Sequence, residues 1–347
     1  MYKVIVPMGY MGSGSSAITD LIREFKGYEA RNNSFEYVFL HCPDGVFDLE
    51  DKLLIGNNAI RSDEALHSFY NRMKELYYHK LWWPANYKKY LHPDFLKYTE
   101  EYINKLTQYK SKNAWYMQQK PTVVTFVKNS IRRLLLIISR GKIQLPYSLR
   151  YSPMLLSFVN EEEFYLASKE YVGQVFKLMG SEETNLIIDQ LLLPHNLWRM
   201  EKYFDENIEC FVIQRDPRDV FIINKYIWRK SDDEVAYPVE VKEFCRYYRH
   251  LRESEKKVDN IHIHRFWFED LIYQYEKSVK KICDILKIDK ESHEQKGTFF
   301  EPEKSINNTQ LFLIEKYEEE VRIIEQELSE YLYQFPYIRK PEIDKSF

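Results

Sequence analysis

Two short segments of the sequence carry residue types that can bind phosphate groups. Residues 9–16 read GYMGSGSS, and residues 214–220 read QRDPRDV, with Arg215 and Arg218 three positions apart. In a small-residue loop that precedes a helix, consecutive backbone N–H groups can surround an anion. A planar guanidinium can donate paired hydrogen bonds to a phosphate. Together the two segments predict a site for a phosphorylated ligand.

The first segment differs from the loop of nucleoside triphosphatases at one position. Gly9, Gly14 and Ser16 fit the pattern GxxxxGK[ST], but Ser15 stands where the phosphate-binding lysine belongs. A triphosphate would lose its charged partner there, whereas amides and hydroxyls suffice around the single phosphate of a 5′-phosphosulfate. The alternative interpretation is a small-residue turn between a strand and a helix, without a ligand.

The second segment carries a family resemblance. A hydrophobic strand at 210–213 runs into RDPRDV, downstream of a PxxxGSS-like loop. This arrangement resembles the sulfotransferases that use 3′-phosphoadenosine 5′-phosphosulfate (PAPS), and among them the bacterial carbohydrate type. Residues 266–271 and 300–308 resemble two further elements of that family, while residues 62–179 match none. The resemblance implies a P-loop-like α/β fold with a large helical insertion.

The resemblance also implies which residues hold PAPS. It implies that Arg215 grips the 3′-phosphate and that the loop with Lys304 and Ser305 closes over the same end of the nucleotide. The 5′-phosphosulfate falls to the glycine-rich loop, namely Gly12, Ser13, Gly14, Ser15 and Ser16. We expect no metal requirement, because the loop has no Lys-Ser/Thr pair of the kind that holds magnesium.

The sequence departs from the family pattern at two positions. Gly12 stands where many members have a lysine or arginine, and Ile223 stands where many have a serine. Either another cation such as Lys304 or Arg218 replaces the missing one, or turnover is reduced, and Asn224 is the candidate for the role of the serine.

Transfer to a hydroxyl needs a general base near the acceptor oxygen. Glu36 is the first candidate and His41 the second, because a strand predicted at 36–40 would end at the sheet edge where open α/β folds bind ligands. Strand alternation would put these two side chains on opposite faces. Asp44 and Asp189 are the remaining candidates, and Asp189 could also bind the acceptor or the nucleotide.

The elements that must position these residues alternate between strand and helix. Apolar runs predict strands at 2–7, 36–40, 186–189, 210–213 and 261–265, with helices at 15–25, 194–204, 221–228 and two further helices towards the C-terminus. This order predicts an α/β fold with a mainly parallel central sheet and helices on both faces. We expect a single domain over 1–347, with 62–179 as a mainly helical insertion that shapes the acceptor site.

Composition limits the partners. With 50 basic and 53 acidic residues, the net charge of −3 gives no overall attraction to nucleic acid. The four cysteines are far apart, which favours reduced core residues over a metal site or disulfides. No run approaches 18 apolar residues and no signal peptide is visible, so we expect a cytoplasmic protein of unspecified oligomeric state.

The segment 62–179 is rich in aromatic residues, which favour core packing over stacking on sugar rings. Within it, Arg132, Arg133, Arg140 and Lys142 surround the apolar run 134–138. This basic amphipathic stretch predicts either peripheral contact with a membrane or an anionic glycan, or an ordinary packed helix.

Three functions follow from these residues. The first is a PAPS-dependent sulfotransferase acting on a hydroxyl or amine of a small acceptor, with saccharides as the acceptor class that the resemblance implies. The second is a P-loop kinase using ATP and magnesium, since the strand ending in Asp189 resembles a magnesium-binding element, although Ser15 counts against it. The third is a catalytically silent nucleotide-binding protein, which Gly12 and Ile223 suggest.

Overall fold

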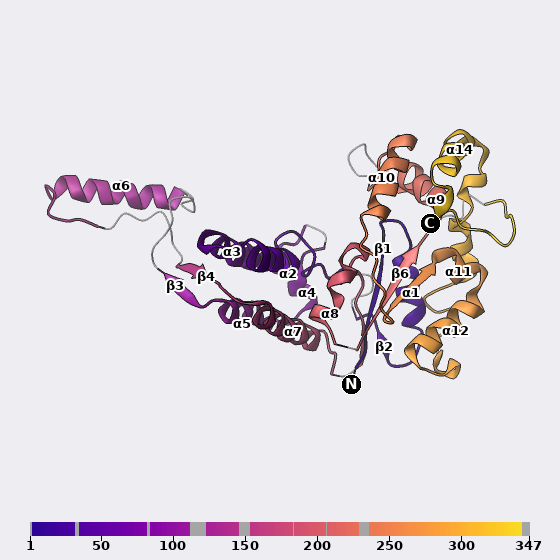
Figure 1. Cartoon of the computed structure of the whole chain (residues 1–347), viewed down its shortest axis with the longest axis horizontal. Coiled ribbons are helices and arrows are strands. Elements are labelled where there is room, and N and C mark those ends of the chain that lie inside the picture. Colours follow the sequence, from indigo (N-terminus) through magenta and orange to yellow (C-terminus); the bar gives the residue numbers. More distant parts are fainter. Residues whose placement is uncertain are drawn as a thin grey trace. The chain divides into compact units, whose positions relative to one another are not determined.

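The computed structural model describes residues 2–31, 35–81, 84–111, 123–145, 153–182, 184–205, 207–228 and 236–341. The chain divides into two compact units, one formed by Met1–His41 with Phe176–Phe347 and the other by Cys42–Val175. Figure 1 labels most of the helices and strands of both. Both phosphate-binding segments predicted from the sequence belong to the first unit.

A five-stranded parallel sheet forms the centre of the first unit (Figure 1). Its strands lie in the order β2 (Tyr28–Glu29), β5 (Asn185–Ile187), β1 (Val4–Gly9), β6 (Ile208–Gln214) and β7 (Ile263–Trp267). The central strand β1 pairs Val4 with Leu186 on one side and with Ile208 on the other. Because all pairings are parallel, the carboxyl ends of β1, β5 and β6 meet at one edge, where open α/β sheets bind ligands.

Helices cover both faces of this sheet. On one face α1 (Ser15–Ile22), α11 (Phe268–Tyr273) and α12 (Tyr275–Leu286) bury apolar side chains against Phe211 and Ile213 of β6. On the other face the sulfur of Cys210 lies 3.4 Å from that of Met200 in α8 (Met200–Tyr203), which continues a 3₁₀ helix at Pro194–Arg199. The predicted α/β fold with a parallel sheet between helices is confirmed.

A second apolar cluster lies beyond the end of β6. It joins α9 (Pro217–Ile222), the π-helical turn Ile223–Trp228, α10 (Val241–Glu253) and α14 (Glu318–Glu327). The short helix α13 (Pro302–Ser305) precedes α14 in the chain. We expected a helix to begin at residue 221, but α9 begins at Pro217, because the Asp216 carboxylate caps it by accepting the N–H of Arg218.

The second unit is mainly helical. Its elements are α2 (Val46–Glu50), α3 (Ala59–Tyr78), α4 (Tyr87–Tyr90), α5 (Asp94–Leu106), α6 (Val123–Ile138) and α7 (Glu161–Leu178), with an antiparallel pair of β3 (Tyr109–Ser111) and β4 (Met154–Leu156). In its core the rings of Tyr102 and Tyr171 stack at 4.8 Å, and their hydroxyls bond Ser168 and Thr99. These tyrosines therefore fill the core, as expected. The aromatic pairs at 82–83 and 115–116 lie outside the described residues.

The predicted strand at 36–40 is wrong. Residues 35–41 form irregular chain and turns, and β2 at Tyr28–Glu29 takes the place beside β5. Val38, Phe39 and Leu40 are all buried, so the segment lacks the alternation of a strand with one exposed face. A backbone hydrogen bond of 3.4 Å from Tyr37 to Asp189 holds it next to the end of β5.

Candidate nucleotide-binding and catalytic site

The glycine-rich loop joins the end of β1 to the start of α1. Gly12 and Gly14 have φ angles of 79° and 88°, the left-handed region that glycine adopts without a steric cost. A Cβ on Gly14 would lie 2.7 Å from the ring of Phe268. The loop closes on itself through a 2.9 Å hydrogen bond from the Ser13 N–H to the carbonyl of Tyr10. Glycine is thus required at position 14 for both backbone angle and space.

Ser13 supplies a buried hydroxyl to this loop. The residue is 3% exposed, and its Oγ has no hydrogen-bond partner within the described residues. A Cβ at Gly9 would lie 2.0 Å from this Oγ, so glycine there leaves room for it. A buried hydroxyl without a partner costs free energy unless a ligand accepts its hydrogen bond. The loop therefore fits an anion such as the 5′-phosphosulfate.

Arg215, which follows β6 directly, links this loop to the C-terminal segment. Its Nη1 donates to the carbonyl of Gly12 at 3.1 Å, and its Nη2 donates to the carbonyl of Asn308. The Nε of the same guanidinium is buried and pairs with no atom of the described chain. Burial lowers the pKa of Arg215, but arginine keeps its charge in proteins. A buried cation with a spare donor beside the loop fits a phosphate.

Three buried carboxylates surround Arg215. Asp216, Asp219 and Glu269 each favour its charged form. Burial, with a smaller contribution from the charge of Asp216, raises the pKa of Asp219 to about 7 and that of Glu269 to about 8. Asp219 accepts the backbone N–H groups of Gln310 and Leu311 at 2.9 and 2.8 Å, which fixes the C-terminal segment next to Arg215.

Arg218 is occupied by other partners. Its Nε and Nη2 donate to Asp216 at 2.9 and 2.8 Å, and its Nη1 donates to Glu325 at 2.7 Å. The guanidinium also lies 3.6 Å from the centre of the Phe312 ring. These contacts tie α9 to α14, so Arg218 acts as a structural residue and does not supply the cation that is missing at Gly12.

Asn224 supports the loop indirectly. Its amide oxygen accepts the N–H groups of Ala236 and Tyr237, and its amide nitrogen donates to the carbonyl of Tyr237 at 3.1 Å. The hydroxyl of Tyr237 in turn donates to the carbonyl of Met11 at 3.0 Å. The side chain of Asn224 is thus bonded to backbone groups through both its oxygen and its nitrogen, and its connection to the phosphate-binding loop runs through Tyr237.

Lys304 and Ser305 lie at the end of α13. Lys304 is exposed and forms an ion pair of 2.6 Å with Glu301 on the same short helix. Ser305 is half-buried. The part of this segment that contacts Arg215 is Asn308, three residues further on. The structure therefore places the C-terminal segment next to Arg215 through Asn308, whereas Lys304 forms an ion pair with Glu301.

Asp189 lies at the end of β5, and Glu36 is near enough for its charge to act on it, so we call the two residues the carboxylate pair. Burial, with a smaller contribution from the charge of Glu36, raises the pKa of Asp189 to about 8. One oxygen of Asp189 is buried without a partner among the described atoms. Because Thr19 and Asp20 of α1 also act on its pKa, this pair lies beside the helix that follows the phosphate-binding loop. Two carboxylates at one site share protons, so near neutral pH Asp189 holds one.

His41 is anchored to the same edge. Its Nε2 lies 2.8 Å from the carbonyl of Gln190, which makes Nε2 the donor of that hydrogen bond. Burial lowers the pKa of His41, which favours the neutral ring. The side-chain nitrogen of Gln190 donates to the Oγ of Ser15 at 3.0 Å. Gln190 thus connects His41 to the loop, although sequence reasoning did not identify it; its φ of 54°, rare for a residue other than glycine, is visible only in the structure.

Asp44 belongs to the second unit. Partial burial raises the pKa of Asp44, but the 2.8 Å hydrogen bond from Lys52, the charges of Lys52 and Arg72 and a hydrogen bond with Ser68 together lower it overall. Asp44 also has a φ of 58° and donates its N–H to Asp48. These contacts assign Asp44 to the turn that precedes α2.

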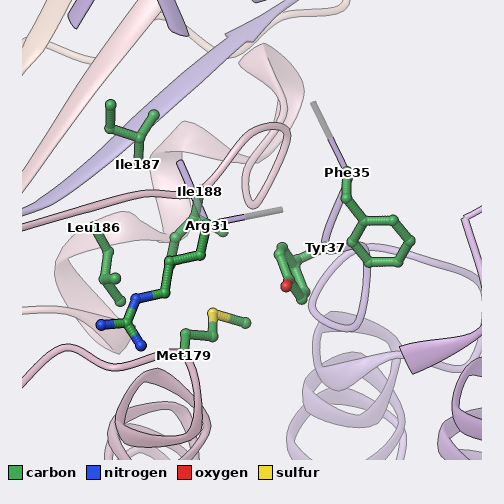
Figure 2. Close-up of a pocket in the computed structure, with 7 residues that line it drawn as sticks. All are labelled: Arg31, Phe35, Tyr37, Met179, Leu186, Ile187 and Ile188. Carbon is green, nitrogen blue, oxygen red and sulfur yellow. The ribbon is translucent and has the colours of Figure 1, made fainter. Parts of the chain in front are cut away.

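A small pocket adjoins the carboxylate pair. Figure 2 shows its lining: Arg31, Phe35, Tyr37, Met179, Leu186, Ile187 and Ile188. Tyr37 and Ile188 are the chain neighbours of Glu36 and Asp189, respectively. The interior has room for about one water molecule, so it does not hold a sugar ring in this conformation.

Comparisons with known proteins give similarity only at the level of structure. No family model matches the sequence, and no curated protein matches it. The sulfotransferase domain of the Synechococcus PCC 7002 olefin synthase is similar over 97% of this chain and 96% of its own, with 13% identity and a TM-score of 0.41. The sulfotransferase domain from the curacin biosynthetic pathway is similar over 96% and 99%, with 14% identity and a TM-score of 0.38.

A third structure, a sulfotransferase from Mycobacterium avium, is similar over 98% of this chain and 78% of its own, with 10% identity and a TM-score of 0.39. At these identities and TM-scores the similarity assigns neither an activity nor a ligand to this chain. Function is therefore inferred from the chain's own residues.

The cysteines agree with the sequence prediction, since Cys42, Cys210, Cys245 and Cys283 are all buried and free. Among the described residues, no cluster of histidine, cysteine, aspartate and glutamate has the geometry to hold a metal ion. In the same part of the chain, no helix has both the length and the apolar character needed to cross a membrane.

Proposed function

We propose that this protein is a sulfotransferase that moves a sulfuryl group from PAPS to a hydroxyl or amine of a small acceptor. The observation that carries the proposal is the position of Arg215, which is buried, bonded to the loop carbonyl of Gly12, and left with a spare Nε donor. A buried cation with one spare donor, beside a small-residue loop that has donors of its own, suits a ligand with two separate anionic groups. PAPS is such a ligand.

The residues of the loop have donors for the 5′ end. The hydroxyl of Ser13 and the backbone of Gly14 lie where α1 begins, and the first N–H groups of a helix attract anions. Arg215 and the segment around Asn308 would hold the 3′-phosphate end. This division needs no lysine at position 15, in agreement with the sequence.

Glu36 is the base in this proposal. Asp189 keeps a proton near neutral pH, and in this proposal the carboxylate of Glu36, whose charge acts on Asp189, accepts the proton of the acceptor hydroxyl. A bond then forms between the acceptor oxygen and sulfur, the bond from sulfur to the bridging phosphate oxygen breaks, and 3′-phosphoadenosine 5′-phosphate (PAP) leaves. His41 and Gln190 position this edge by their hydrogen bonds. We propose a saccharide as the first acceptor class to test.

A P-loop kinase is the second candidate, favoured by the carboxylate of Asp189 at a strand end. Ser15 replaces the lysine that such enzymes use, and the raised pKa of Asp189 opposes the ionised form that magnesium binds. A silent nucleotide-binding protein is the third.

The discriminating experiment compares thermal unfolding with PAP and with ATP plus magnesium, because a ligand stabilises the fold in proportion to its binding. We expect PAP to raise the midpoint, also in the presence of EDTA, and Arg215→Lys to abolish most of that shift. Arg322→Lys, an exposed arginine paired with Glu318, is the matched control. A shift with ATP and magnesium alone would favour the kinase, and PAP binding without turnover of labelled PAPS on any glycan, lipid or phenol would favour the silent protein.

A further inference from the structure

Helix α6 exposes most of its apolar side chains. Val123, Phe126, Leu134, Ile137 and Ile138 are between 56% and 81% exposed, and Thr125 is the buried residue of the helix. A helix of this length is only marginally stable in water by itself, and burial of an apolar face normally stabilises it. Within the described residues, the apolar face of α6 therefore lacks the cover that a helix of this kind requires.

The exposed residues share one face. At about 100° per residue, Val123, Val127, Ile131, Leu134 and Ile138 fall within a single arc, and Phe126 and Ile137 extend it. Lys128 lies at one border of this arc and Arg133 at the other. Basic residues thus flank the apolar face on both sides, which is typical of helices that lie in the surface of a lipid bilayer.

The charge around α6 is of one sign. Between Glu101 and Glu161 the sequence contains no acidic residue, but it contains ten basic ones: Lys105, Lys110, Lys112, Lys120, Lys128, Arg132, Arg133, Arg140, Lys142 and Arg150. The chain as a whole has a net charge of −3. Positive charge is therefore concentrated in this one segment, which is complementary to an anionic surface.

We propose that α6 docks onto the surface of an anionic lipid bilayer, with its apolar face below the headgroups and its flanking basic residues among the lipid phosphates. At 16 residues the helix is about 24 Å long, shorter than the roughly 30 Å of a hydrocarbon core, so it lies in the surface and does not span it. The proposal goes beyond the sulfotransferase activity and does not depend on it.

A second copy of this chain is a poorer cover. It would bring the same basic segment to the same face, and like charges at short distance repel. Phosphate headgroups supply the opposite charge over an extended area, and the acyl region supplies the apolar environment.

The test is co-sedimentation of the full chain with vesicles of phosphatidylcholine alone and of phosphatidylcholine mixed with phosphatidylserine. We expect binding only to the mixed vesicles and a decrease with added salt. The double variant Arg133→Gln with Lys142→Gln should bind about fivefold more weakly for each charge removed. Leu134→Asp, which places a charge on the apolar face, should abolish binding.

Leu166→Asp on α7 is the matched control, because Leu166 is also an exposed leucine, at 70%. It should bind as the parent does, and equal thermal midpoints would show that all variants are folded. Absence of binding to mixed vesicles, or unchanged binding of Leu134→Asp, would overturn the proposal. Two other results would also overturn it. If Leu134→Asp forms a smaller assembly than the parent protein in the absence of vesicles, the apolar face serves self-association. If the parent protein is retained on a sulfated polysaccharide but does not bind vesicles, the face binds a glycan.

Discussion

The guanidinium carbon of Arg215 lies 4.5 Å from the centre of the Phe268 ring, and the same ring occupies the space that a side chain at position 14 would need. One aromatic side chain at the start of α11 therefore contacts the guanidinium of Arg215 and also excludes a side chain at position 14 of the loop. Cation–π contact of this kind favours the charged guanidinium in a buried place.

We expect Phe268→Leu to raise the Kd for PAP by about tenfold, because the guanidinium loses the ring that fixes its plane. Isothermal titration would measure the change. Phe266→Leu is the control, since Phe266 is buried in the same cluster but has Lys281 rather than Arg215 over its ring. Equal losses in the two variants would assign Phe268 to packing alone.

Arg215→Lys should weaken PAP binding by about 2 kcal/mol, the scale of a charge-assisted hydrogen bond, because lysine keeps the charge but loses the planar fork. Retention of full affinity in a folded Arg215→Lys protein would contradict the proposed site. Direct titration with PAP gives the answer independently of the acceptor.

Glu36→Gln should lower kcat by roughly 100-fold while the affinity for PAP stays the same, since the amide cannot take a proton. His41→Gln should cost less, because His41 acts through Gln190. Steady-state rates with labelled PAPS would rank the two. Full turnover in both variants would leave Asp189 as the next residue to change.

The stability of the folded protein should respond to pH through Asp189. Its pKa is raised from an ordinary 3.8 to about 8, so over that interval the folded state keeps a proton that the unfolded chain releases. Unfolding then releases a proton, and the free energy of unfolding falls as the pH rises. In Asp189→Asn this loss disappears.

The variant should therefore gain stability over the parent between pH 5 and about pH 8, by an amount on the order of a few kcal/mol at the upper end. Denaturant titrations of both proteins across the range would measure the difference, from which the shared contributions of Asp219 and Glu269 cancel. A difference that does not vary with pH would show that Asp189 is ionised throughout.

Tyr237→Phe should raise the Kd for PAP severalfold, since the carbonyl of Met11 loses a hydrogen bond worth about 1 kcal/mol. Tyr247→Phe is the control, because Tyr247 packs against Tyr237 but is nearly half exposed. Identical affinities of the two variants for PAP would show that the hydrogen bond from Tyr237 to the loop does not contribute to binding.

The sequence allowed the framework of the site to be predicted but not its contacts. Strand and helix alternation gave the parallel sheet, and the loop and Arg215 meet because each follows a neighbouring central strand. Phe268, Gln190 and Tyr237 escaped prediction, because their roles depend on side chains that reach across more than a hundred positions of sequence or on a backbone angle.

Dependence on distant contacts also explains why two residues have other partners in the structure than we expected from the sequence. Arg218 was expected to help with charge at the loop, but its partner Glu325 comes from a distant helix. The amide of Asn224 was expected at the nucleotide, but the chain near Tyr237 folds back over it. Neither of these long-range contacts produces a periodic pattern in the sequence from which it could be predicted.

The central place of β1 has a consequence for the newly made chain. On the ribosome β1 emerges early, yet its partners β5 and β6 follow only after the whole unit Cys42–Val175 has been synthesised. Until then β1 is an apolar strand with both edges unpaired, and such strands tend to form incorrect pairings. Asn308, the partner of Arg215, is synthesised later still, so the proposed nucleotide site is completed last.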